Sequence, residues 1–387
     1  MLNIKSNIIL KHIFSHIKRR IILNFSKYNN ALKEKLNITK NDFEDYKFFR
    51  QLNKEYNFDF KNIDDKILNL SNKKLGNKIF EYLNKVNFIS LSEIDLSLNK
   101  ITEIKSILNN KLSSITNINL CYNKIEYINE LDKSFFPNLI ILSLGINQIS
   151  DINILEKVNF IELKILSLYG NKISDINILD KVNFPKLEKL NLNQNNISNI
   201  DVLSKSNFPN LKELYLNRNE IIDINVLQNA KFPKLELLDL IKNKISDINI
   251  LEKVNFKELK YLSLAGNEIS NINILSKVEF PKLETLNLGK NKISDINVLE
   301  KVNFRELKEL ILLSNNISNI SVLDKVKFEK LEFLNLDFNL VSDISVLEKV
   351  NFRKLKSLYL SGNKISENSL LDIYKLGNLP LLDLSYI

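Results

Sequence analysis

Few residues in this chain of 387 have types and spacings that could support catalysis or metal binding. His12 and His16 are four positions apart, so on a helix they would share one face and could together ligate a metal ion. Ile13, however, stands where a zinc protease would need its Glu, and no nearby cluster of ligands completes a site. Cys121 is the single cysteine, and we interpret it as a small strand residue. We therefore expect no metal site and no cofactor.

Other catalytic patterns are also missing from the sequence. Both histidines lie within the first 16 residues, so a Ser–His–Asp triad has no candidate in the later part of the chain. The sequence contains no Gly-rich phosphate loop and no Cys/His spacing typical of zinc sites. These observations predict that the protein is not an enzyme and that its function is binding.

A 24-residue unit dominates the chain and returns with small changes from Leu91 to the end. Over residues 163–186 it reads LKILSLYGNKISDINILDKVNFPK, and its skeleton is L-x-x-L-x-L-x-x-N-x-I followed by x-x-I-x-x-L and a Phe. The asparagine recurs without a slip in register, at Asn99, Asn123, Asn147, Asn171, Asn195, Asn219, Asn243, Asn267, Asn291, Asn315, Asn339 and Asn363. A fixed period of this length indicates a solenoid, in which each unit packs only against its neighbours.

Each repeat predicts the same short elements. Residues 166–168 should form a strand with alternate side chains inward, and stacked repeats should form a curved parallel sheet. The amide of Asn171 can satisfy backbone groups of neighbouring turns, so we interpret the asparagines as a structural ladder. Ser174 or Asp175 could cap a short helix after the turn. Phe184 and its equivalents should close the outer side of the core, with Leu112 as the exception.

The skeleton resembles the leucine-rich repeat family over roughly three quarters of the chain. The motif N-x-I-S-D-I-x-x-L is similar to that of the subclass found in the regulatory subunit of protein phosphatase 1 and in internalins. The repeats of that subclass are usually about 22 residues long. The resemblance implies an α/β fold, a right-handed solenoid (horseshoe) with a parallel concave sheet. It also implies short helical or 3-10 segments on the convex side and an N-terminal helical cap. The longer repeat in this chain suggests a longer convex turn.

The expected organisation is a region 1–62 followed by a leucine-rich-repeat domain 63–387. Within that domain, residues 63–90 form a degenerate repeat and residues 91–387 form regular ones. A degenerate first repeat is typical of a capping position. The simplest interpretation of residues 1–62 is a helical cap that covers the apolar end of the solenoid.

Two other hypotheses for the N-terminus remain open. The string ILKHIFSHI at residues 9–17 is similar to the core of an F-box, the helix that docks the Skp-type adaptor of ubiquitin ligases. That resemblance implies adaptor binding by Leu10, Ile13, Phe14 and Ile17. Alternatively, the nine Lys or Arg against one acid in residues 1–40 could form a basic helix that lies on an anionic membrane or addresses mitochondria.

The strand positions that do not repeat are the candidates for function, because the repeating ones are scaffold. Several outward positions carry aromatic or aliphatic residues without a packing reason, and Tyr and Arg are enriched in binding hot spots. The candidate residues are Tyr122, Ile141, Ile146, Ile165, Tyr169, Tyr215, Arg218, Leu237, Asp239, Ile241, Tyr261, Ile311, Leu313, Phe333, Asp337, Phe338 and Tyr359. They predict a concave face that binds a partner protein, whereas the absence of a basic stripe argues against nucleic acid.

Charges alternate at the position seven residues before the ladder asparagine. The series is Lys164, Glu188, Lys212, Glu236, Lys260, Glu284, Lys308, Glu332 and Lys356. Adjacent strands would place opposite charges side by side, so we predict a solvated ladder of ion pairs and not a ligand site.

Composition predicts an intracellular, cytoplasmic location. A single cysteine excludes an internal disulfide framework, and no stretch is long and apolar enough for a transmembrane helix. Lys11 and His12 interrupt the only early apolar run, which argues against a signal peptide. We expect a monomeric protein–protein scaffold or adaptor. The alternatives are an F-box-like substrate receptor of a ubiquitin ligase and a phosphatase regulatory subunit.

Overall fold

The computed structural model of the chain describes residues 30–36, 66–83, 91–104, 114–133, 136–350, 352–366 and 381–383. The predicted adaptor-binding residues Leu10, Ile13, Phe14 and Ile17 lie outside these ranges, as does the boundary expected at residues 62 and 63. The described part of residues 1–62 is a helix, α3 (Asn30–Leu36). The cap, the F-box and the basic membrane helix therefore stay predictions.

The chain divides into two compact units, Met1–Ile149 with Lys157–Leu163, and Ser150–Glu156 with Lys164–Ile387. The first unit contains β1 (Ile67–Asn69), α5 (Lys78–Leu83), β2 (Glu93–Asp95), β3 (Asn117–Asn119), η2 (Asn129–Lys133) and β4 (Ile141–Ser143). The strands of the second unit are β5 (Ile165–Ser167), β6 (Lys189–Asn191), β7 (Glu213–Tyr215), β8 (Leu237–Asp239), β9 (Tyr261–Ser263), β10 (Thr285–Asn287), β11 (Glu309–Ile311), β12 (Phe333–Asn335), β13 (Ser357–Tyr359) and β14 (Leu381–Asp383). Its 3-10 helices are η3 (Asn153–Glu156), η4 (Asn177–Asp180), η5 (Asp201–Ser204), η6 (Asn225–Asn229), η7 (Asn249–Glu252), η8 (Asn273–Lys277), η9 (Asn297–Lys301), η10 (Ser321–Asp324) and η11 (Ser345–Glu348).

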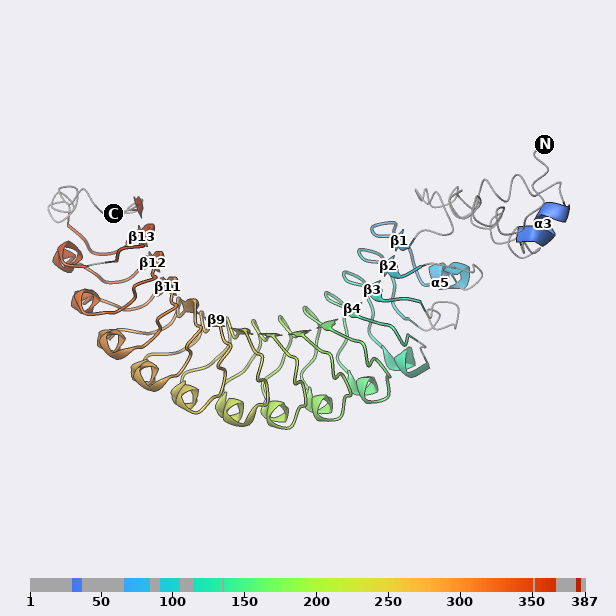
Figure 1. Cartoon of the computed structure of the whole chain (residues 1–387), viewed down its shortest axis with the longest axis horizontal. Helices are drawn as coiled ribbons and strands as arrows, with labels where there is room; N and C mark the ends of the chain where they lie inside the picture. The colour runs from blue at the N-terminus through green and yellow to red at the C-terminus, as the bar shows by residue number, and fades with distance from the viewer. Residues whose placement is uncertain are drawn as a thin grey trace. The chain divides into compact units, whose positions relative to one another are not determined.

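Within each unit the strands pair in parallel with their sequence neighbours, in the register that the repeat dictates. Leu286 lies opposite Leu310 across β10 and β11, one full repeat later. In the first unit Leu68 lies opposite Ile94, so the degenerate repeat also supplies a strand. In the second unit the strands line the inner side of the curve and the 3-10 helices line the outer side (Figure 1). The parallel sheet and the short convex segments are confirmed.

An Asp or Asn side chain two residues before each 3-10 helix of the second unit accepts the N–H of the first helix residue, which settles the choice between Ser174 and Asp175. The N–H of Asn177, the first residue of η4, donates a hydrogen bond of 2.8 Å to Asp175 Oδ1. Ile176, directly before the helix, provides no side-chain cap. Such a bond satisfies a donor that the first turn of a helix leaves unpaired. The same bond recurs at Asp151, Asn199, Asp223, Asp247, Asn271, Asp295, Asn319 and Asp343.

A column of phenylalanines closes the outer side of the core, as the repeat predicts. The rings of Phe208 and Phe232 stack with their centroids 6.4 Å apart, and those of Phe280 and Phe304 stack at 6.5 Å. Between 0% and 3% of each residue is exposed at Phe136, Phe160, Phe184, Phe208, Phe232, Phe256, Phe280, Phe304 and Phe328. The last member, Phe352, is only partly buried.

The asparagine ladder has the structural role expected of it. Asn195 Oδ1 accepts the N–H of Ile173 at 3.0 Å, and its amide nitrogen donates to the carbonyls of Leu168 and Leu192 at 3.1 and 3.0 Å. One side chain thus satisfies backbone groups of its own turn and of the preceding one. Each buried member of the ladder is less than 10% exposed, which leaves little of it for a ligand.

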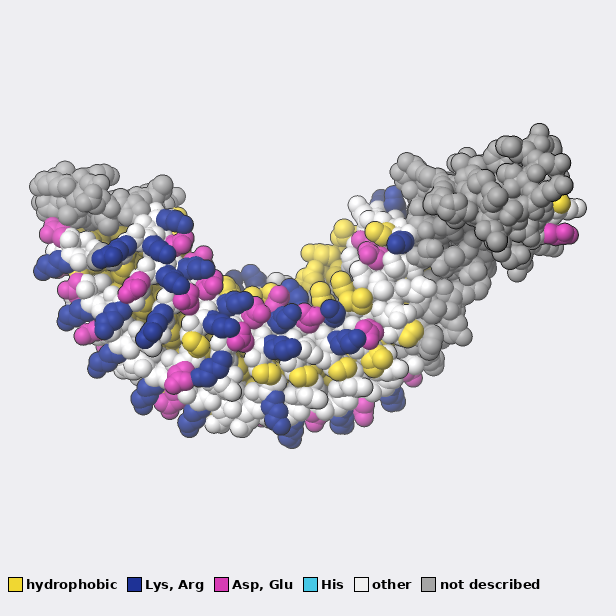
Figure 2. Space-filling view, viewed as in Figure 1, with side chains coloured by type: hydrophobic (Ala, Val, Ile, Leu, Met, Phe, Trp, Pro, Cys, Tyr) yellow, Lys and Arg dark blue, Asp and Glu magenta, His cyan; other side chains and the backbone are white. Residues whose placement is uncertain are grey.

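The alternating charges form the predicted ladder of ion pairs in the second unit. Glu188 contacts two lysines, with Nζ–Oε distances of 3.1 Å to Lys164 and 2.7 Å to Lys212. Lys260 with Glu236, Lys308 with Glu284 and Lys356 with Glu332 continue the series at 2.7, 2.8 and 2.5 Å. Lys and Asp or Glu side chains accordingly mingle over this unit (Figure 2). Because these groups are largely solvated, each ion pair contributes little to the free energy of unfolding.

The double pairing of Glu188 makes the small stabilisation by this ion pair depend on pH. Hydrogen bonds from Lys212 and then from Lys164 lower the pKa of the Glu188 carboxyl below its ordinary value of 4.5. A lowered folded-state pKa stabilises the fold above the unfolded pKa, and this contribution is lost as the pH falls through the folded value. We expect Glu188→Gln to reduce the fall in thermal midpoint below about pH 4.5. The exposed Glu300→Gln is the control, and identical pH profiles of both variants would contradict the ladder's contribution.

Candidate protein-binding face

The open face of the sheet is the side of each strand that points away from the core. Leu166, in the middle of β5, is buried, whereas Ile165 and Ser167 on either side of it are partly exposed. The first and last strand residues and the residue two before the ladder asparagine form this open face. The residue directly before the asparagine forms what we call the rim.

Every residue predicted for partner binding lies on the open face or on its rim. Strand positions hold Ile141, Ile165, Tyr215, Leu237, Asp239, Tyr261, Ile311, Phe333 and Tyr359. Tyr169, Ile241, Leu313 and Asp337 lie two residues before the ladder asparagine, and Tyr122, Ile146, Arg218 and Phe338 lie on the rim. Their participation in binding stays a prediction, and Asp239 is only 7% exposed.

The rim has an unusual backbone conformation. Its residues have positive φ, 64° at Gly170 but also 57° at Tyr122 and 54° at Phe338. This left-handed region favours Gly and is an outlier for bulky or β-branched residues such as Ile146, with φ 51°. The side chains of Tyr122 and Phe338 are nevertheless about half exposed. The backbone conformation recurs at polar rim residues such as Lys242, so only the exposure of the apolar side chains is unexplained by packing inside the fold.

A polar cluster lies on β6 and β7. Lys189 Nζ is 2.8 Å from Glu213 Oε2 and 4.6 Å from the centroid of the Tyr215 ring. The Tyr215 hydroxyl donates a hydrogen bond of 2.8 Å to Glu213 Oε2. Burial acts to raise the pKa of Glu213, but the bonds from Lys189 and Tyr215 lower it overall. Burial and the Glu213 carboxylate both raise the pKa of Tyr215. In this cluster, Lys189 neutralises the carboxylate of Glu213 on the open face.

The neighbouring strands β8 and β9 carry a buried carboxylate. Asp239 accepts the N–H of Ile241 at 3.1 Å and the side-chain amide of Asn217 at 2.7 Å. Tyr261 lies nearby and is half-buried, and burial followed by the Asp239 charge raises its pKa. In this part of the face the carboxylate is bonded within the protein, and Tyr261 is a partly exposed ring.

Aromatic side chains gather on the last repeats. The rings of Phe333 and Tyr359 are tilted against each other with centroids 5.1 Å apart. Phe338 on the rim is 55% exposed, and a Cβ added at Gly362 would lie 2.5 Å from its Cδ1. The glycine thus makes room for the exposed ring. The last repeats therefore present an exposed ring at Phe338 and a tilted pair of rings at Phe333 and Tyr359.

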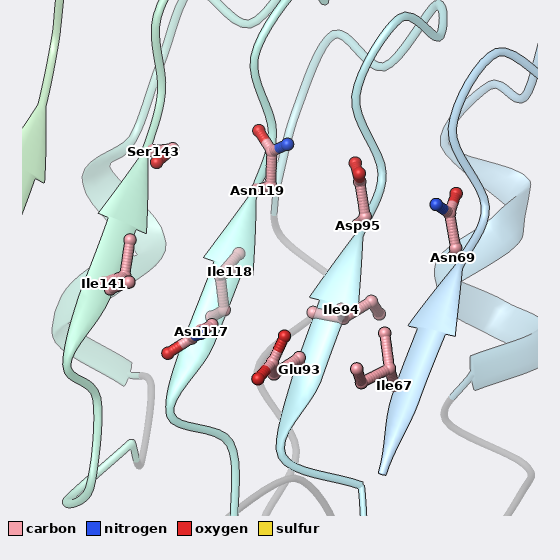
Figure 3. Close-up of a pocket in the computed structure, with 10 residues that line it drawn as sticks. All are labelled: Ile67, Asn69, Glu93, Ile94, Asp95, Asn117, Ile118, Asn119, Ile141 and Ser143. Atoms are coloured by element: carbon pink, nitrogen blue, oxygen red, sulfur yellow. The ribbon is translucent and has the colours of Figure 1, made fainter. Parts of the chain in front are cut away.

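The first unit has a pocket on its open face, across β1 to β4. Its volume is about 310 Å³, and its lining residues are Ile67, Asn69, Glu93, Ile94, Asp95, Asn117, Ile118, Asn119, Ile141 and Ser143. Figure 3 shows the two carboxylates projecting from β2, with the isoleucines of β1 and β4 on either side. The pocket combines apolar walls with a concentration of negative charge.

An apolar ridge follows the same strands along the rim. It consists of Leu98, 50% exposed, Tyr122, 47% exposed, and the partly exposed Ile146. Successive turns stack, since the N–H of Leu98 donates to the carbonyl of Cys121 and that of Tyr122 to the carbonyl of Gly145, both at 2.9 Å. Hydrophobic side chains gather beside β3 and β4 on the inner side of the molecule (Figure 2). Contiguous exposed apolar groups of this kind mark interaction surfaces.

Sequence reasoning missed part of this surface. Ile67, Glu93 and Leu98 are not among the predicted residues: Ile67 lies in the degenerate repeat and Glu93 is charged, whereas no feature of the sequence distinguishes Leu98 from the candidates. Lys189 and Glu213 occupy the same strand position in successive repeats. A column-by-column comparison of charges, like the one that revealed the ion-pair ladder, would have found them.

The stacked short strands, 3-10 turns and asparagine ladder define a class, the repeat solenoids with a parallel inner sheet. The family model Leucine Rich repeats (2 copies) matches residues 161–205, 185–229 and 257–301. The chain is a leucine-rich-repeat protein, and solenoids of this kind typically provide extended surfaces for protein–protein interaction.

Solved structures share the fold at low sequence identity. An internalin of Listeria monocytogenes is 24% identical over 98% of both chains, with a TM-score of 0.67. A leucine-rich-repeat protein of Leptospira interrogans is 22% identical over 82% of this chain and 90% of that one, with a TM-score of 0.61. A search of curated proteins gave no match. None of the described helices is long and apolar enough to cross a membrane.

Proposed function

We propose that this protein is an adaptor that binds a partner protein on the open face of its sheet. One observation carries the proposal. Apart from Phe352 and Asn363 in the last repeats, the described scaffold phenylalanines and ladder asparagines are buried, yet the open face keeps Tyr169, Tyr215 and Tyr261 partly exposed. Such rings lose little conformational entropy on binding and supply the contact area of hot spots.

The residues of the open face also differ from repeat to repeat, unlike the scaffold residues. The last strand residue is Asn in β6, Tyr in β7, Asp in β8 and Ser in β9. A surface that served only stability would repeat with the rest of the unit. The variation supports recognition of one shaped partner along the face.

The test is a pull-down from cells with the triple variant Tyr169→Ala, Tyr215→Ala and Tyr261→Ala. We expect it to lose proteins that the wild-type chain retains. Tyr127→Ala is the matched control, because Tyr127 is 63% exposed but lies beyond the open face and its rim. An unchanged set of partners in the triple variant would refute the assignment to this face.

The same pull-down addresses the finer hypotheses. Recovery of a Skp-type adaptor would favour the F-box-like receptor, and recovery of a phosphatase catalytic subunit would favour the regulatory subunit. The described residues provide no observation that favours either of them over a general adaptor.

A further inference from the structure

The pocket on β1 to β4 carries negative charge that none of the described side chains neutralises. Its lining includes Glu93 and Asp95 and contains no basic residue. Asp95 Oδ1 accepts the N–H of Ser97 at 2.9 Å, which uses one of its two oxygens. In the described ranges neither carboxylate forms an ion pair. Carboxylates grouped beside apolar walls attract a cation more strongly than they would in open water.

The second unit shows how this sheet holds a cation next to such a carboxylate. Glu213 occupies in β7 the position that Glu93 occupies in β2, and Lys189 from the preceding strand neutralises it at 2.8 Å. The position of Lys189 corresponds to Ile67 in the first unit. Where one unit supplies its own lysine, the other presents an isoleucine that is 56% exposed.

We infer that the pocket binds a lysine or arginine side chain of the partner protein, a conclusion that rests on the proposed function. The cationic end lies between Glu93 and Asp95. The aliphatic stem lies against Ile67, which pairs with Glu93 across β1 and β2, because long basic side chains cover apolar surface with their methylene groups. The ridge of Leu98, Tyr122 and Ile146 takes an apolar residue beside the basic one. The partner segment is therefore basic with apolar neighbours.

The probe for this pocket is Nα-acetyl-arginine amide, and its neutral isostere Nα-acetyl-citrulline amide is the reference. Binding to the full chain is followed through the Ile methyl NMR signal of Ile67, assigned with Ile67→Val. We expect the arginine probe to shift the signal of Ile67, and the citrulline probe to leave it in place.

Charge-removing variants test the carboxylates. Asp95→Asn keeps the local turn, since Asn119 accepts the corresponding N–H of Cys121 at 3.1 Å. We expect Glu93→Gln and Asp95→Asn each to weaken arginine binding about tenfold, because charged hydrogen bonds are the strong ones. Glu309→Gln is the matched control, because Glu309 occupies the same strand position in β11.

Equal shifts with arginine and citrulline, or full arginine binding in the Glu93→Gln and Asp95→Asn double variant, would overturn this inference. Either result leaves the proposed function standing if the triple tyrosine variant still loses its partners. Conversely, the arginine probe could bind as expected while the triple tyrosine variant keeps every partner. That pair of results would support the pocket and refute the role of the three tyrosines.

Discussion

Replacing Asn243 with Ala is expected to lower the free energy of unfolding of the second unit by about 1–3 kcal/mol. Asn243 Oδ1 accepts the N–H of Ile221 at 3.1 Å, and its amide nitrogen donates to the carbonyls of Leu216 and Leu240 at 3.0 Å. The variant leaves the N–H of Ile221 without a partner. The carbonyls of Leu216 and Leu240 each lose one of two donors, because the amides of Asn219 and Asn267 still bond to them at 3.1 and 2.9 Å. An unsatisfied buried donor costs about 1–3 kcal/mol, and a water molecule that enters the site would offset part of that cost.

The loss also falls on the contact between two repeats. A solenoid is stable through its nearest-neighbour interfaces, so a weakened interface in the middle of the unit reduces cooperativity. Urea unfolding followed by circular dichroism should show a lower midpoint and a broader transition. Asn249→Ala is the control, because that asparagine is exposed in the same repeat. Matching curves for the two variants would show that the ladder does not stabilise the fold.

The scaffold was predictable because each of its requirements recurs in every repeat. A buried Leu, a ladder asparagine and a Phe at fixed spacing define the register without any tertiary information. The asparagines satisfy the backbone as expected, and Glu188 pairs with Lys164 and Lys212 as the alternating charges predict. Only the capping residue stayed ambiguous, because Ser and Asp both accept such bonds, and the structure assigns it to Asp175.

The surface was harder to predict because its features do not repeat. The rim is left-handed whether it carries Gly170, Tyr122 or Phe338, so residue type gives no signal for that conformation. Stacking between adjacent turns imposes it instead. The charge of the pocket is visible only from the strand pairing. Ile67 lies beside Glu93, whereas in the second unit Lys189 lies at the corresponding position and pairs with Glu213. Such a contrast needs the strand alignment that the structure supplies.

Phe232→Ala is expected to destabilise the second unit by about 3–5 kcal/mol, the usual cost of emptying a buried phenylalanine site. Phe232 is 1% exposed, and its ring stacks on that of Phe208 at 6.4 Å. Removing the ring loses the transfer free energy of burial and leaves a cavity, because the solenoid backbone is held by hydrogen bonds on both sides and cannot collapse.

Phe338→Ala provides the comparison, since its ring is 55% exposed on the rim. We expect it to change the free energy of unfolding by less than about 0.5 kcal/mol, as is typical of surface substitutions. Its effect should fall on partner binding instead. Thermal unfolding of both variants, measured with the pull-down, separates the two roles. A Phe338→Ala variant that unfolds as readily as Phe232→Ala would mean that the rim stabilises the fold, and would remove the reason to treat it as a binding surface.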